Sequence, residues 1–369
     1  MGVCFMNTFK VTPYSVSGKI DYDKLIKDFG LRLVDESLID DFDFPHKLLK
    51  MKYFFVHRDL DKIAQFYKEH GRFAIVSGRG ASEHIHLGHT LLFKFVLDLQ
   101  KHFNAFLFVP ISEDEKYFAK QGLSFEDARK YAIENLVDLV ALGLDMKNTE
   151  FVIDTLTMNA KIYGLAAKIA KRITLSTVNA VYGFSNDQNI GLHFFPAMQA
   201  AHILYPTVEK DLPSLVVISV DQDPHVRVSR DVAEKLKLFK PASLESRFLK
   251  GLSGEEKMSA SDPYSSIYIN DSAKLVRKKV WRAFTGGQPT VKEQKKLGGN
   301  PDICPIYEYN ALFFDTFDEA RNRYQRCKSG ELLCGDCKNE LIKRLQKFLE
   351  SHRKEREKAE EKVSKLLEE

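Results

Sequence analysis

Long hydrophobic runs are missing from this chain of 369 residues. No apolar stretch approaches the ~20 residues that a membrane-spanning helix needs. The segment from Met1 to Lys10 also lacks the charged start and apolar core of a secretory signal, so we expect a cytoplasmic protein with no membrane partner. Charge of one sign is not in large excess either, since 55 Lys and Arg stand against 51 Asp and Glu, a net charge of +4. That balance does not by itself require a nucleic-acid partner.

Cysteine is scarce as well, with five in the whole chain. A reducing compartment disfavours disulfide bonds, so these thiols are expected to be free, catalytic or metal-binding. Hydrophobic residues make up 44% and charged residues 29%, which is ordinary for a globular protein. The length allows two or three domains, each with its own core.

Short apolar segments alternate with helical patterns through the middle of the chain. Strands are predicted at 74–76, 105–111, 151–153 and 215–220, and helices at 86–103 and 125–142. This alternation predicts an α/β fold built on a Rossmann-like, doubly wound parallel sheet. From Ser272 onward the strand signals largely stop, and the pattern becomes helical, with one long charged helix at 340–369.

Polar or flexible residues directly follow three of the predicted strands. They are the Gly78–Gly80 turn, Asp114-Glu115 and Asp221-Gln222-Asp223. Ligands of doubly wound sheets bind at the carboxyl ends of the strands, near the point where the strand order reverses. We therefore expect these three groups to converge on one crevice.

Two separated motifs have the composition of a nucleotide site. The first is Ser77-Gly78-Arg79-Gly80 followed by His86-Leu87-Gly88-His89, and the second is Lys257-Met258-Ser259-Ala260-Ser261. Glycines allow a tight turn with backbone close to the nucleotide, and a helix N-terminus favours phosphate. Lys257 would supply a mobile cation for the leaving pyrophosphate, and Ser259 and Ser261 would supply hydroxyl donors.

With these motifs, the chain resembles the class I aminoacyl-tRNA synthetases, and among them the tryptophanyl-tRNA synthetases of the archaeal and eukaryotic type. Further matching segments are 19–26, 55–59, 113–117, 195–201, 221–224, 258–263 and 298–300, and the resemblance runs from about residue 10 to 360. It implies ATP with Mg²⁺, activation of L-tryptophan to tryptophanyl-AMP, and transfer of the tryptophanyl group to tRNA(Trp).

The same resemblance implies a domain plan and a set of site residues. The plan is an N-terminal extension at 1–70, a catalytic domain at 71–270, and an α-helical anticodon-binding domain at 271–369, with a homodimer formed through an insertion at about 115–205. The implied catalytic residues are His86, His89, Lys257 and Ser259. The implied ATP-binding residues are Gly78, Arg79, Gly80, His86, Gly88, His89, Lys257, Met258, Ser259 and Ser261, and the implied tryptophan-binding residues are Glu115, Gln199 and Gln222.

The chain departs from the family where the indole is usually recognised. Val76 and Pro110 occupy the positions where relatives carry a Tyr and a Gln near the ring nitrogen. Selection would then rest on another group or on shape, with an aromatic residue packed on the ring: Phe54, Phe73, Phe108 or Phe195. A tyrosine–tRNA ligase is one alternative, and a non-catalytic RNA-binding or redox-sensing paralogue is the other.

Four of the cysteines form a spaced set near the C-terminus, C-x22-C-x6-C-x2-C at Cys304, Cys327, Cys334 and Cys337. Two thiolates reachable from one turn are the usual bite of a metal site, and four suit Zn²⁺ or a [4Fe–4S] cluster. The resemblance favours the iron–sulfur cluster over zinc. Basic residues around this set are candidates for contact with RNA phosphates. They are Arg321, Arg323, Arg326, Lys328, Lys338, Lys343 and Arg344.

Overall fold

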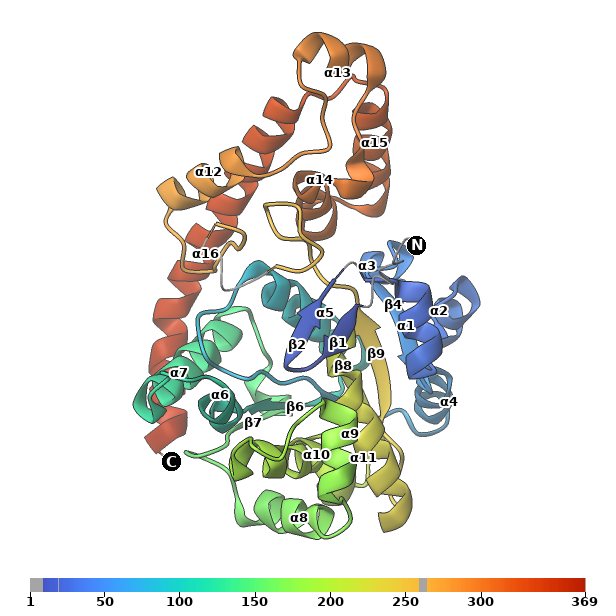
Figure 1. Ribbon diagram of the computed structural model, residues 1–369, viewed down its shortest axis with the longest axis vertical. Helices are drawn as coiled ribbons and strands as arrows, with labels where there is room; N and C mark the ends of the chain where they lie inside the picture. Colours follow the sequence, from blue (N-terminus) through green and yellow to red (C-terminus); the bar gives the residue numbers. More distant parts are fainter. Residues whose placement is uncertain (1–8, 19, 259–263, 369) are drawn as a thin grey trace, which may run out of the picture.

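A seven-stranded mixed sheet forms the centre of the computed structural model, which describes residues 9–18, 20–258 and 264–368 (Figure 1). The strand order is β3-β4-β9-β8-β5-β6-β7. The strands are β3 (Arg32–Leu33), β4 (Phe54–Arg58), β5 (Ala74–Val76), β6 (Phe106–Ile111), β7 (Thr149–Ile153), β8 (Ser214–Ser219) and β9 (Ala242–Ser246). A separate two-stranded hairpin consists of β1 (Lys10–Thr12) and β2 (Ser15–Ser17).

The five strands from β5 to β9 run parallel, and their order along the sheet is that of a Rossmann-like half. The chain starts at β5, moves outward through β6 and β7, and returns to β8 and β9 on the other side of β5. The order therefore reverses between β5 and β8. The predicted doubly wound α/β fold is confirmed, and antiparallel β3 and β4 extend the sheet beyond β9. Those two strands come from the segment before residue 71.

Helices cover both faces of this sheet. One hydrophobic cluster joins α5 and α7 to one face, and a second joins α8, α10 and α11 to the other. The helices are α1 (Tyr22–Phe29), α2 (Glu36–Phe42), α3 (Lys47–Lys50), α4 (Leu60–His70), α5 (Leu87–Phe103), α6 (Glu113–Ala119), α7 (Phe125–Ala141), α8 (Ala160–Ala170), α9 (Leu175–Tyr182), α10 (Ile190–Lys210) and α11 (Asp223–Leu236).

The region after β9 is helical, as the sequence predicts. Its helices are α12 (Ala273–Arg282), α13 (Val291–Leu297), α14 (Pro305–Tyr309), α15 (Phe317–Lys328) and α16 (Cys334–Glu368). In Figure 1 this region stands beyond one end of the sheet, and α16 runs back along the molecule to α7. His352 and Arg356 of α16 contact buried Asp138 of α7, with N–O distances of 3.0 and 2.8 Å. This ion pair ties the helical region to the sheet-bearing region.

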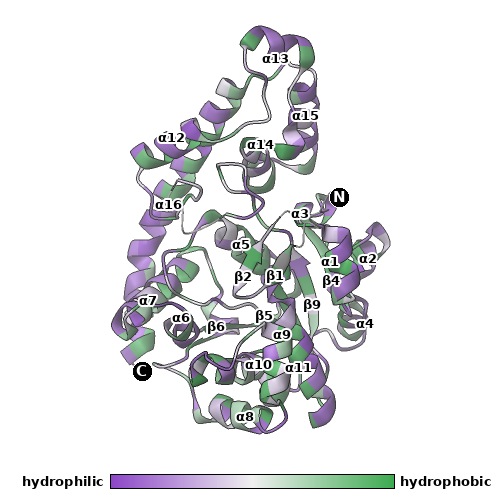
Figure 2. Cartoon of the chain, viewed as in Figure 1, coloured by the Kyte–Doolittle hydropathy of each residue, from purple (hydrophilic) through white to green (hydrophobic). Residues whose placement is uncertain are grey.

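The long C-terminal helix begins at Cys334, six residues before the predicted start, so Cys334 and Cys337 lie in its first turn. Figure 2 shows α16 as mainly hydrophilic along its length, which agrees with the charged pattern. Within the described residues, no helix combines the length and the apolar character needed to cross a membrane.

Strand β9 is the element that pattern reading misses. Its sequence, Ala-Ser-Leu-Glu-Ser, contains no apolar run, yet all five residues are buried between β8 and β4. Glu245 fits there because its carboxyl oxygen accepts a 2.6 Å hydrogen bond from Ser243 and because burial raises the pKa of that carboxyl. Tertiary position, and not local hydrophobicity, makes this segment a strand.

Candidate active site

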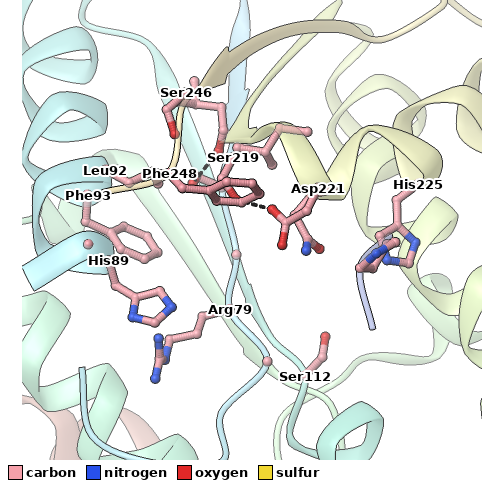
Figure 3. A pocket seen from close by; sticks show the side chains of 18 of the residues that line it. Arg79, His89, Leu92, Phe93, Ser112, Ser219, Asp221, His225, Ser246 and Phe248 are labelled. Atoms are coloured by element: carbon pink, nitrogen blue, oxygen red, sulfur yellow. Dashed lines mark hydrogen bonds between the residues drawn. The ribbon is translucent and has the colours of Figure 1, made fainter. Parts of the chain in front are cut away.

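A cavity of about 620 Å³ opens where the strand order reverses, at the carboxyl ends of β5, β6 and β8 (Figure 3). Its walls also include the start of α5, the starts of α6 and α11, the middle of α10, the turn of the β1–β2 hairpin, and Lys257 and Met258. A volume of this size suits a small-molecule substrate with a nucleotide. Of the site residues expected from the sequence, those lining it are Gly78, Arg79, Gly80, His86, Gly88, His89, Glu115, Gln199, Gln222, Lys257 and Met258.

The two turn glycines are needed because other groups pass close to their Cα atoms. A Cβ on Gly78 would lie 2.4 Å from the backbone oxygen of Pro110, and a Cβ on Gly80 would lie 2.3 Å from the Oε2 atom of Glu115. Real Cβ atoms do not approach other atoms so closely. The turn after β5 can therefore pack against the backbone of β6 only without a side chain at Gly78, whereas the atoms near Gly80 are movable ends of side chains.

The rings of His86 and His89 pack against each other at the N-terminus of α5, with centroids 3.8 Å apart and planes tilted by 37°. His86 is the N-cap, and its Nδ1 atom accepts a 3.1 Å hydrogen bond from the backbone of Gly88. Burial, followed by the nearby Arg79 guanidinium, lowers the pKa of both imidazoles well below 6.5. Both rings are therefore neutral at pH 7 and act as hydrogen-bonding groups.

Lys257 is held in the cavity by a carboxylate. Its ammonium lies 2.9 Å from Oδ2 of Asp221, which is buried in the short turn between β8 and α11, and 4.7 Å from the ring centroid of Phe248. Although burial works against ionisation of Asp221, Lys257 and a hydrogen bond from Ser219 keep the pKa of this carboxyl below its usual value. A phosphate group entering here would compete with Asp221 for the ammonium.

The acid and the two amides also line the cavity, and the Gln222 side chain hydrogen-bonds with Asp221, the partner of Lys257. Glu115, which is only 6% exposed, forms a 2.9 Å ion pair with Lys116 in the first turn of α6. Gln199 projects from α10, and Gln222 caps α11. Such groups can bind an ammonium and a carboxylate, as in a free amino acid.

Two residues of the expected crevice lie elsewhere. Asp223 is fully buried and pairs with Arg58 of β4 at 2.6 Å. Asp114 faces Asp154 at the end of β7, and burial and this second carboxyl raise the pKa of Asp114 to about 9. The expectation that both line the crevice is wrong, because each belongs to the packing between elements. Ser259 and Ser261 lie outside the described residues.

The aromatic residues named as possible ring-packing partners are also placed differently. Phe54, Phe73, Phe108 and Phe195 are core residues with exposures of 1% or less, and none of them lines the cavity. The cavity aromatics are instead Tyr14, Tyr53, Phe93 and Phe248. No sequence signal identifies Tyr14, because its position depends on how the β1–β2 hairpin folds over the site. His225, however, follows the 221–224 motif directly, and extending that motif by one residue would have found it.

The four spaced cysteines line a second, much smaller cavity, between α14, α15 and the start of α16. Burial raises the pKa of the Cys327 thiol to about 11 and that of Cys337 to about 12, and neighbouring cysteines add to the shift of Cys327. The Sγ atom of Cys337 lies 3.6 Å from the Asn310 amide and 3.9 Å from the Arg323 guanidinium. No three acidic, His or Cys side chains of the described chain are grouped to hold a single metal ion.

Some of the basic residues near this cavity have internal partners. Arg323 is 8% exposed and forms ion pairs with Asp315 at 2.7 Å and Glu340 at 2.9 Å. Arg344 pairs with the same two carboxylates, and Lys338 donates to two backbone carbonyls of the α12 end. The expectation of RNA contact is wrong for Arg323, because its charge is buried and already compensated. Arg321, Arg326, Lys328 and Lys343 are exposed.

A Rossmann-like sheet with a nucleotide-type cavity at its switch point is the architecture of a class I synthetase, and comparison with known families agrees. Residues 68–350 match the model of the family "tRNA synthetases class I (W and Y)". The chain therefore belongs to the class I aminoacyl-tRNA synthetases that act with tryptophan or tyrosine, and within them its similarity is to the tryptophan members.

Two relatives illustrate that similarity. The tryptophan–tRNA ligase of Thermococcus kodakarensis is 42% identical over 98% of this chain and 94% of its own length. That of Pyrobaculum calidifontis is 41% identical over 96% of each chain.

Solved structures of tryptophanyl-tRNA synthetases have the same fold. The enzyme of Aeropyrum pernix superposes with a TM-score of 0.86 at 33% identity, covering 94% of this chain and 96% of its own. The enzyme of Encephalitozoon cuniculi bound to tryptophan gives 0.84 at 32% identity, covering 92% and 95%.

Proposed function

We propose that this chain is a tryptophan–tRNA ligase. It activates L-tryptophan with ATP and Mg²⁺ to tryptophanyl-AMP and then transfers the tryptophanyl group to tRNA(Trp). The observation that carries the proposal is that residues of the first motif, Lys257 and Met258 of the second, and the three amino-acid-binding candidates line one cavity, in a chain related over 98% of its length to a tryptophan–tRNA ligase. This relationship favours tryptophan over tyrosine.

In the first step, a carboxylate oxygen of tryptophan attacks the α-phosphorus of ATP, and pyrophosphate leaves. Glu115 binds the substrate ammonium, while Gln199 and Gln222 orient the carboxylate. Positioning of this kind removes much of the entropic part of the barrier. Glu115 is suited to the task because it is buried and charged beside Lys116, and because Gly80 lets the nucleotide loop approach it.

His86 and His89 donate hydrogen bonds to the phosphates from the start of α5, where the helix N-terminus adds a favourable field. A neutral imidazole still carries one N–H group, so each ring can donate a hydrogen bond to a phosphate oxygen. Lys257 stabilises the negative charge on the pyrophosphate after exchanging Asp221 for phosphate oxygens. No covalent bond to the enzyme forms in this scheme.

In the second step, a hydroxyl of the terminal ribose of the tRNA attacks the tryptophanyl carbonyl carbon, and AMP leaves. The helical region beyond α12 binds the anticodon end, and its exposed cations Arg321, Arg326, Lys328 and Lys343 contact phosphates. The contact of α16 with Asp138 holds this region against the catalytic one.

The four cysteines hold a [4Fe–4S] cluster in this proposal. Their thiols share one cavity, and amide and guanidinium donors near Cys337 suit sulfur atoms that carry negative charge. Such a cluster would crosslink α14, α15 and α16. Zinc on the same thiolates is the alternative.

A homodimer formed through residues 115–205 is also proposed. This segment exposes several large apolar side chains, a composition that favours association. They are Tyr117, Leu156, Tyr163, Leu175, Ile190 and Phe194, with Ile190 83% exposed.

ATP–pyrophosphate exchange with single amino acids tests the proposal. We expect exchange with tryptophan and little with tyrosine, followed by charging of tRNA(Trp) in a separate assay. Exchange with tyrosine and none with tryptophan would show the wrong substrate. Absence of exchange with every amino acid would indicate the non-catalytic alternative.

A further inference from the structure

The part of the cavity beyond Glu115, Gln199 and Gln222 has a mainly apolar wall. Val76 of β5, Pro110 of β6, Val216 of β8 and Ile203 of α10 line it, with Val226 from α11. These residues belong to the sheet face covered by α8, α10 and α11, whereas His86, His89 and Lys257 are at the nucleotide end. An aromatic side chain in this space would meet hydrocarbon on most sides.

His225 interrupts this apolar wall. It lies in the first turn of α11, is 3% exposed, and lines the cavity on the side opposite Arg79 and His89 (Figure 3). Burial, followed by the nearby charge of Lys116, lowers the pKa of its imidazole to about 3, while Asp221 acts weakly in the opposite direction. The ring is therefore neutral at pH 7 and has one nitrogen that can accept a hydrogen bond.

The ring of His225 is fixed from behind. Its Nδ1 atom lies 3.0 Å from the hydroxyl of Tyr182, which is itself buried, and the edge of Phe195 packs at a centroid distance of 6.3 Å. Among the described residues, Nε2 of His225 has no hydrogen-bond partner. Either atom of this pair can be the donor; in the tautomer in which Nδ1–H donates to the Tyr182 hydroxyl, Nε2 is an acceptor at the wall of the cavity.

We propose that Nε2 of His225 accepts a hydrogen bond from the ring N–H of the substrate and thereby selects an indole. This inference rests on the proposed function and adds the residue that reads the side chain. Val76 and Pro110 then serve as apolar packing surfaces for the ring. Tyr182 is a positioning residue, because it touches His225 and sets which nitrogen carries the proton.

Ser112 is the competing acceptor in this part of the cavity. Its hydroxyl is also buried and lines the same space, but it lies at the N-terminus of α6 beside Glu115 and Lys116. That position suits contact with the charged end of an amino acid. His225 has the better placement for the ring, since it is held by Tyr182 within an apolar wall.

The test compares tryptophan with β-(3-benzothienyl)alanine, in which sulfur replaces the ring N–H. The readout is kcat/KM for each compound in ATP–pyrophosphate exchange. For the unmodified protein, we expect tryptophan to be preferred about 10-fold, which corresponds to one lost hydrogen bond with a buried partner. In His225→Phe the preference should fall to near unity, while KM for ATP stays unchanged.

Three further variants complete the test. His225→Gln keeps an acceptor and should restore part of the preference, and Tyr182→Phe should weaken it because the imidazole is no longer fixed. His193→Phe, on α10 outside the cavity, is the matched control and should leave the preference intact. If His225→Phe does not fold, His225→Leu takes its place.

A preference that survives in both apolar variants overturns the inference, and so does its loss in Ser112→Ala alone. Equal use of the two compounds by the unmodified protein also overturns it. These outcomes differ from failure of the proposed function, in which the unmodified protein shows no exchange with tryptophan at all.

Discussion

Two cavities of this molecule differ in the charged and titratable groups that line them. The switch-point cavity measures about 620 Å³, and its charged groups already have partners, such as Asp221 for Lys257 and Lys116 for Glu115. The cysteine cavity measures about 20 Å³; two of its cysteines are buried and two are half-buried, and burial raises the thiol pKa of Cys304, Cys327 and Cys337. The first cavity lies at the ends of sheet strands, whereas the second lies between helices and is lined by the four cysteines.

This difference has an energetic basis. The carboxylates of the catalytic cavity have cationic partners, which lower the cost of burying them. Thiols with a raised pKa must lose protons before they bind a metal or a cluster, and the ligand must supply the compensating charge. We therefore expect damage in one cavity to leave the other largely unaffected, and the predictions for Lys257, His225 and Gly287 below test that independence.

The largest expected effect comes from Lys257→Ala. Loss of a cation aimed at the leaving group should lower kcat/KM in ATP–pyrophosphate exchange by about 10²–10³-fold, the usual size for one charge-stabilising group. Iron and sulfide content should not change. Lys250→Ala is the matched control, because Lys250 pairs with Glu308 away from the cavity. Full activity of Lys257→Ala would remove this residue from the mechanism.

Next comes Gly78→Ala, in which the new Cβ would lie 2.4 Å from the backbone oxygen of Pro110. Since backbone cannot rotate away, we expect a loss of ~1–3 kcal/mol in the free energy of unfolding, together with weakened exchange. Gly164→Ala on α8 meets nothing within 4 Å and should instead stabilise by about 0.5–1 kcal/mol. Denaturant unfolding measures both variants. Equal stability of the two would contradict the close packing of β5 on β6.

The third prediction concerns the stability of the fold at acidic pH. His225 has a pKa lowered to about 3, below the 6.5 of an unfolded chain, so the unfolded state takes up its proton first as the pH falls. Stability from this residue is complete above pH 6.5 and decreases toward pH 3, by about 1.4 kcal/mol per pH unit. Replacing His225 by Phe should remove that part of the slope in unfolding measured from pH 7 to 5. The control variant Cys337→Ala should keep the dependence of the free energy of unfolding on pH. If His225→Phe also keeps it, the imidazole of His225 is not neutral and buried in the folded protein.

Much of this arrangement could be predicted from the sequence, and the exceptions have physical reasons. The strands β5, β6 and β8 and the helix α5 follow from apolar periodicity, and the crevice follows from polar residues placed after strands. The strand β9 could not be found, because its burial depends on neighbours and not on its own composition. The prediction that Arg323 contacts RNA is wrong because a pattern of charges in the sequence does not reveal the two carboxylates, Asp315 and Glu340, that pair with it.

The smallest expected effect is that of Gly287→Ala, which tests the cysteine cavity in the way that Gly78→Ala tests the other. The new Cβ would lie 2.4 Å from Sγ of Cys334, but a side-chain sulfur can turn to another rotamer, so the cost in stability should be about 1 kcal/mol or less. The turned thiol should no longer face its three companions. We expect lower iron and acid-labile sulfide in anaerobically purified protein, with unchanged ATP–pyrophosphate exchange.

Gly335→Ala is the matched control for this change, because a Cβ there meets nothing within 4 Å although Gly335 lies between Cys334 and Cys337. It should retain the cluster. If ATP–pyrophosphate exchange falls together with the iron content, the two cavities are coupled. The contact of α16 with Asp138 would then be examined, because it joins the helix that carries Cys334 and Cys337 to the catalytic region. Retention of iron in Gly287→Ala would instead show that Cys334 is not one of its ligands.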